Sequence, residues 1–172
     1  RLTVDGQSMT QPFVIKKDPR LPTSPSEFQE QFDLLIAVRD KVSAAHTAIN
    51  RILAMRNQLE AATARAREVA GGERVVAEAR KLDEKLSDIL GELFEPRFTG
   101  IDDQLLVFPL KLNNRIASLQ GAVASADRKP TDQARQNFQE LGGLLDAQLA
   151  RLKTLADKDV AAFNTLVREQ GL

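Results

Sequence analysis

The stretch that decides the fold runs from Ser24 to Glu60 and reads SPSEFQEQFDLLIAVRDKVSAAHTAINRILAMRNQLE. It begins with a strong helix start: Ser24 can cap the first turn, Pro25 fits the first helical position, and Glu27 completes a capping box. Apolar side chains then recur every three or four residues, as on one buried helical face: Phe28, Phe32, Leu35, Ile36, Val42, Ala45, Ile49, Ile52, Leu53 and Leu59. No Gly or Pro interrupts the pattern before Gly71-Gly72, which predicts one helix of about 45 residues.

Three further helices are predicted beyond the two glycines. They run from about Glu73 to before Pro96, from about Pro109, and from a Thr131 cap to about Glu169. The last has the most regular apolar stripe: Phe138, Leu141, Leu145, Leu149, Leu152, Leu155 or Ala156, Val160, Phe163 and Leu166 or Val167. The sequence therefore predicts an all-α fold, an antiparallel four-helix bundle with two long and two short helices. We expect the short helices to cover one half of the long pair, and the apolar segment 94–108 and the N-terminal β piece to cover the other half.

The N-terminal residues predict a β-hairpin. Leu2 and Val4 alternate with polar neighbours, Asp5-Gly6 is a tight-turn signal, and Gln7–Ile15 resumes an extended pattern. The predicted organisation is a hairpin over residues 1–17, a Pro-rich linker over 18–24 and a helical bundle over 25–172. Since a lone hairpin is marginal in water and the chain opens on Arg1, we expect the hairpin to be the remnant of an upstream β domain.

Composition excludes several classes of function. The 172 residues include equal numbers of basic and acidic side chains (24 each), no Cys and one His. Balanced charge gives no field that favours nucleic acid, and no apolar run approaches the length of a membrane span. Without a catalytic or nucleotide-binding motif, we expect a non-enzyme that carries no cofactor and no metal.

Few residues qualify as a site. His46 could bind a metal, but it lacks a second ligand at helical spacing and is more simply a residue at the edge of the buried stripe. Asn113, Asn114 and Arg115 could recognise a polar ligand or a partner loop, or form an interhelical polar contact. Asp102-Asp103 could bind a cation, or cap a turn.

The order of features resembles a known tail. Its N-terminal part reads RLTVDGQSMTQPFVI followed by Asp18-Pro19-Arg20, and three later matches are residues 112–115, residues 125–127 before Pro130-Thr131, and residues 145–149. This resembles the C-terminal region of bacterial secreted proteins described as sortilin-like or BNR-repeat glycosyl hydrolase-like. The resemblance implies an upstream β-propeller and immunoglobulin-like domain, and a periplasmic or secreted location. The hydrolase description belongs to the propeller, so no catalytic residue carries over.

Three hypotheses follow. The first is a non-catalytic C-terminal accessory, interaction or spacer module that contacts the upstream domains of its own polypeptide and forms a homodimer through its long helices. The alternative is a periplasmic four-helix sensor module that binds a small ligand through Arg39, Arg51 or Arg115. The third is an enzyme with segment 94–108 as a lid.

Overall fold

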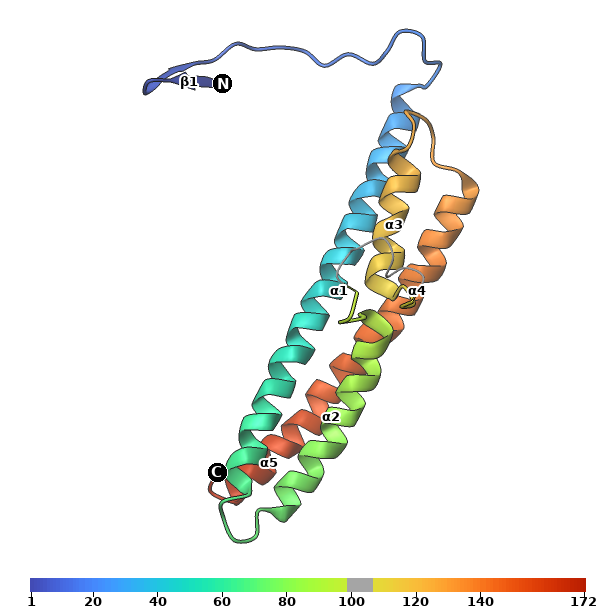
Figure 1. Cartoon of the computed structure of the whole chain (residues 1–172). Coiled ribbons are helices and arrows are strands. Elements are labelled where there is room, and N and C mark those ends of the chain that lie inside the picture. The colour runs from blue at the N-terminus through green and yellow to red at the C-terminus, as the bar shows by residue number, and fades with distance from the viewer. Residues whose placement is uncertain (99–106) are drawn as a thin grey trace.

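The computed structural model describes residues 1–98 and 107–172, which are mostly helical with a short two-stranded sheet at the N-terminus (Figure 1). The predicted helical character and the predicted hairpin are both confirmed. The elements are β1 (Leu2–Val4), β2 (Gln7–Met9), α1 (Pro25–Ala66), α2 (Glu73–Leu93), α3 (Leu112–Ala124), α4 (Asp132–Leu155), the π-helical turn η2 (Ala156–Val160) and α5 (Ala161–Glu169). No helix in these two ranges is both long and apolar enough to cross a membrane.

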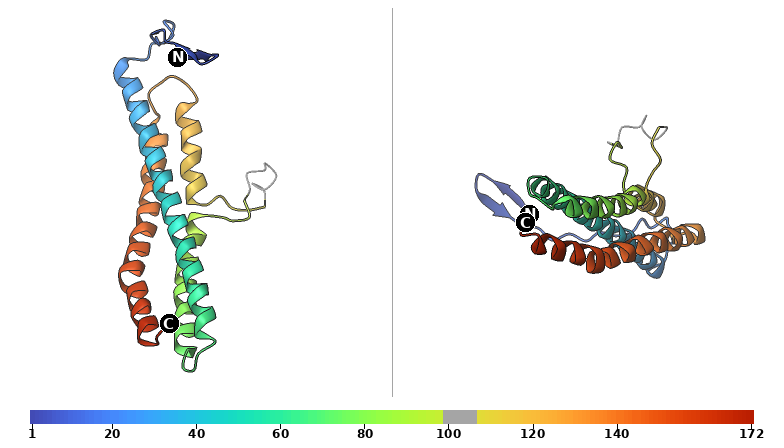
Figure 2. Two further views of the ribbon diagram at one scale, coloured as in Figure 1. Left: turned by 90° about the vertical axis from the view of Figure 1, so that its left-hand side faces the viewer. Right: turned by 90° about the horizontal axis from the view of Figure 1, so that it is seen from below.

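The short helices α2 and α3 lie one after the other along α1. Helix α2 packs on the C-terminal half of α1 and on α4 and α5, whereas α3 packs on the N-terminal half of α1 and on α4 (Figures 1 and 2). Each short helix therefore covers one half of the long pair, so the expectation that both cover the same half, with the N-terminal β piece over the other, is wrong. Part of segment 94–108, expected to help there, lies outside the described residues.

The buried face of α1 repeats every seven residues. Its most regular row consists of Gln31, Val38, Ala45, Ile52, Leu59 and Ala66. A seven-residue repeat winds neighbouring helices around each other in a left-handed sense. Phe32 and Leu53, predicted to face inward, are instead 57% and 40% exposed. Each follows a member of the row by one residue, which turns its side chain by about 100° toward solvent.

The turn between α1 and α2 starts before its glycines. Helix α1 ends at Ala66 rather than near Gly71. The chain then folds back tightly, and a β-carbon on Gly72 would lie 1.8 Å from the Ala66 carbonyl oxygen. Gly71 has a φ of +84°, a conformation that favours glycine. The predicted caps at the helix starts are confirmed, since Ser24 and Thr131 each accept a hydrogen bond from a backbone N–H of the first turn.

The C-terminal helix is continuous from α4 to α5 but contains one π turn, η2. The buried residues Leu145 and Leu152 are seven apart, whereas Leu155 and Phe163 are eight apart. A regular α-helix would bring Ala162 to the place that Phe163 occupies. The wider π turn in η2 accommodates one extra residue, so Phe163 and Leu166 again lie on the buried face of the helix.

The hairpin lies outside the helical core. Strands β1 and β2 pair through a turn in which Asp5 and Gly6 both have positive φ, as predicted for this dipeptide. The second strand ends at Met9, short of the predicted Ile15, and Pro12 cannot donate to a strand ladder. Residues 1–17 are exposed throughout.

Candidate functional site

His46 is exposed on α1, not at the edge of the core. Ala45 and Ala48 are both buried, and the side chain of His46 points about 100° away from that of Ala45, toward solvent. Within the described ranges, no group of three or more His, Asp and Glu side chains could hold a metal ion. His46 is therefore part of no such group within the described residues.

The predicted polar triplet is split around the start of α3. Asn113 is buried, Asn114 is half-buried and Arg115 is exposed, because consecutive helical residues point about 100° apart. The Oδ1 atom of Asn113 is buried and accepts no hydrogen bond from any described group. The structure therefore does not bring the three side chains together as one ligand site, and Asp102-Asp103 lie outside the described residues.

The arginines named for a sensor site are exposed and do not converge. Arg39 pairs with its neighbour Asp40 at 2.7 Å, and Arg51 and Arg115 face solvent. The largest fully buried side chains are all apolar: Ile52, Leu86, Ile89, Leu93, Ile116, Leu145, Val38 and Val75. None of the three arginines therefore lines an interior polar site within the described residues.

Glu95 is a buried carboxylate that the sequence did not single out. It accepts two hydrogen bonds from the Arg97 guanidinium, at 2.7 and 2.9 Å, and one from the Arg97 backbone N–H. The guanidinium bonds lower the pKa of Glu95 to about 2, against the opposing effect of burial. Arg97 also lies over the Phe108 ring, 4.5 Å from its centroid. The ionised Glu95 holds Arg97 in place, and it is Arg97 that contacts Phe108 on the far side of the α2–α3 connection.

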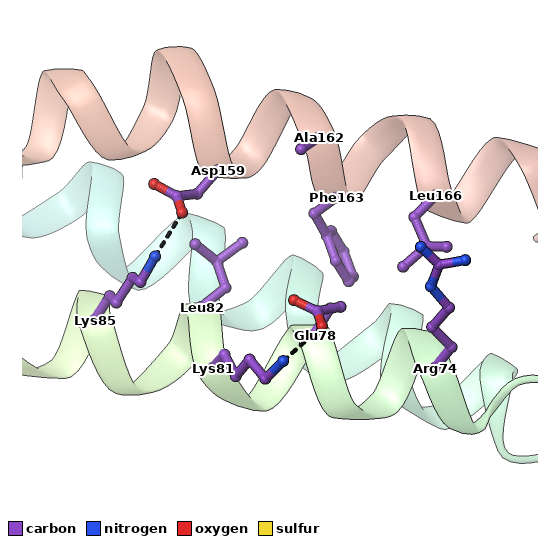
Figure 3. A pocket seen from close by; sticks show the side chains of 9 residues that line it. All are labelled: Arg74, Glu78, Lys81, Leu82, Lys85, Asp159, Ala162, Phe163 and Leu166. Atoms are coloured by element: carbon purple, nitrogen blue, oxygen red, sulfur yellow. Dashed lines mark hydrogen bonds and ion pairs between the residues drawn. The ribbon is translucent and has the colours of Figure 1, made fainter.

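A groove of about 260 Å³ lies between α2 and the η2–α5 segment (Figure 3). Leu82, Phe163 and Leu166 form its apolar part. The cations around it are partly neutralised, since Lys85 pairs with Asp159 at 2.5 Å and Lys81 with Glu78 at 2.7 Å, the latter contact lowering the pKa of Glu78. The groove therefore offers an apolar cleft rimmed by ion pairs, without a convergent set of catalytic groups.

A larger groove of about 680 Å³ follows the outer seam of α1 and α2. It continues toward the α1–α2 turn as a second hollow of about 590 Å³, and the two share Arg67, Val76 and Arg80. Sequence reasoning did not single out this region as a candidate site. The available signal was the seven-residue spacing of Glu60 and Arg67, which places opposite charges on one side of α1.

The most extensive exposed apolar surface belongs to the N-terminal segment. Phe13, Val14 and Ile15 are 82%, 79% and 86% exposed, and Leu2, Val4 and Met9 of the hairpin are each at least half exposed. Comparison with protein-family models, with curated proteins and with solved structures gives no match for this chain. The exposed apolar side chains of the N-terminal segment are therefore the feature from which a function can be proposed.

Proposed function

We propose that this chain is an antiparallel four-helix bundle that serves as a non-catalytic accessory module, and that its N-terminal segment attaches it to a β-sheet domain. The exposed apolar face of residues 1–15 is the observation that carries the proposal. The sequence resemblance supports an upstream propeller and immunoglobulin-like domain in a periplasmic or secreted bacterial protein as the setting.

The hairpin has the two-faced pattern of a strand pair that covers a core. Leu2 lies opposite Met9, and Val4 lies opposite Gln7, so these side chains share one face. Thr3 lies opposite Ser8 on the other face, where their hydroxyls are hydrogen-bonded at 2.8 Å. Antiparallel sheets with one apolar and one polar face bury the apolar face in proteins. The hairpin thus has the surface of a sheet whose packing partner is a further β layer.

The linker after the hairpin is fastened to the end of the helices. The Lys17 ammonium donates to the carbonyls of Leu21 and Thr23, at 3.2 and 2.7 Å. The buried Thr23 hydroxyl donates to the Asp127 carbonyl between α3 and α4 at 2.6 Å. These bonds fix residues 17–23 against the α3–α4 connection, and residues 10–16 join this anchor to the hairpin.

The test is a binding titration against a separately purified propeller plus immunoglobulin-like pair of the resembled class, followed by calorimetry. Val4→Lys puts a charge on the apolar face and is expected to abolish binding. Thr3→Lys adds the same charge to the adjacent position on the polar face and serves as the matched control. A wild-type chain that does not bind, or two variants that weaken binding equally, would refute the proposal.

A further inference from the structure

The groove along the outer seam of α1 and α2 carries an inference separate from the proposed β-domain attachment. It lies at the end of the molecule opposite the hairpin, near the α1–α2 turn (Figure 1). On the α1 side its lining includes Leu53, Glu60, Thr63, Ala64 and Arg67. Leu53 is 40% exposed there, although it has the apolar character of a packing residue.

Two charges in this groove stand apart from the others. Arg56 pairs with Asp83 at 2.7 Å across the seam, so these two neutralise each other. Glu60 and Arg67 are both exposed and take part in no ion pair within the described residues. Glu60 lies on α1 and Arg67 is its C-cap residue with helical backbone angles, so the two side chains leave the same side of the helix about 10 Å apart along its axis.

This pattern is complementary to itself. If a second α1 lies antiparallel across the groove with the two-fold axis between Thr63 and Ala64, Glu60 of each copy faces Arg67 of the other. A two-fold interface repeats every contact, so one such ion pair implies two. If positions 60 and 67 carried two acidic or two basic side chains, the same arrangement would place like charges opposite each other.

We propose that the α1–α2 groove binds a second copy of this chain through antiparallel α1 helices, with two reciprocal Glu60–Arg67 ion pairs. The two α1 helices overlap at their C-terminal ends, where Val76 on α2 supplies apolar contact and Thr63 and Ala64 are small enough for close approach. Because salt screens exposed ion pairs, the dimer is expected to weaken as the salt concentration rises. The mixed polarity of the groove is typical of interfaces that dissociate on dilution.

Charge reversal tests this arrangement. Sedimentation equilibrium of the whole chain measures the dissociation constant of the wild type at low salt. Glu60→Arg and Arg67→Glu each replace two attractions by two repulsions, so each is expected to raise that constant roughly 10- to 100-fold. The double variant E60R/R67E restores both pairs with exchanged signs and returns the constant to near the wild-type value.

Two controls make the result specific. Glu68→Arg reverses an exposed charge at the same end of α1 but outside the groove, and it is expected to leave the dissociation constant unchanged. The chain has no cysteine, so a spin label at Ala61→Cys, which is exposed near the axis but does not line the groove, is unique and is expected to give a short pair distance. A monomer at every concentration, single reversals without effect, a double variant that does not recover, or widely separated labels would each overturn the proposal.

Discussion

Gln31 is a buried polar side chain on which the helix ends depend. Its side-chain amide nitrogen, Nε2, donates to the carbonyls of Val123 and Ala126, at 2.7 and 2.8 Å. Helix α3 ends at Ala124, so the Val123 carbonyl has no partner within a continuing helix, whereas the Ala126 carbonyl also accepts a hydrogen bond from the Arg128 backbone N–H at 2.9 Å. Replacement of Gln31 by Met keeps the length and helix propensity of the side chain but removes both donors.

The magnitude follows from the burial of the two acceptors. The bond to Val123 is buried, so its carbonyl loses a partner without water to replace it, at a cost of about 1–3 kcal/mol. The Ala126 bond is only partly buried, and water can substitute at a cost of about 0.5–1 kcal/mol. The free energy of unfolding should therefore fall by about 1.5–4 kcal/mol, which for this size of chain lowers the Tm by about 3–16 °C.

The assay is urea and thermal unfolding followed by circular dichroism, with Gln29→Met as the matched control. Gln29 lies two residues earlier on α1 and is exposed, where its amide bonds only to Asp33. The control is expected to change the Tm little, because exposed substitutions seldom matter by more than about 0.5 kcal/mol. A Gln31→Met Tm equal to that of the control would refute the assignment of Gln31 as the cap of α3.

Three further outcomes are expected. Ile52→Ala removes a fully buried side chain at the middle of α1 and should lower the free energy of unfolding by about 2–5 kcal/mol in the same urea assay. Gly72→Ala forces a β-carbon against the Ala66 carbonyl and should cost at least about 1–3 kcal/mol; a neutral result would show that the turn can shift. Because the folded-state pKa of Glu95 lies at about 2, below the ordinary 4.5, its carboxylate stabilises the fold fully above pH 4.5 and loses that effect as pH falls toward 2. Carboxyl NMR titration checks this, and Arg97→Met should raise the pKa of Glu95; an ordinary pKa in the wild type would contradict the assignment.

Helix starts could be predicted from the sequence because caps are local. Ser24 and Glu27 lie in one turn, and their reciprocal hydrogen bonds need no information from elsewhere in the chain. The choice of buried face is less local. Phe32 is more apolar than Gln31, yet Gln31 faces inward because its partners lie 92 and 95 residues away at the end of α3. Spacing alone could not supply that preference.

The candidate sites were harder to predict for the same reason. The triplet from Asn113 to Arg115 is contiguous in sequence, but helical geometry separates its side chains. Glu60 and Arg67 are only seven residues apart, but they line a common surface only once α2 forms a groove beside them. The eight-residue step from Leu155 to Phe163 was visible in the sequence, whereas its consequence, a π turn, needed the packed structure.

The length of α1 gives the proposed dimer a further property. Helix α1 begins at Pro25, at the end of the linker from the hairpin, and the two-fold axis lies between residues 63 and 64. Each arm is therefore about 58 Å long, and the two hairpin-bearing ends point in opposite directions about 115 Å apart. Such a dimer would keep the starts of its two α1 helices at a fixed separation, because no Gly or Pro lies within α1 after its first residue to let it bend. That separation would limit how close two attached β domains can come.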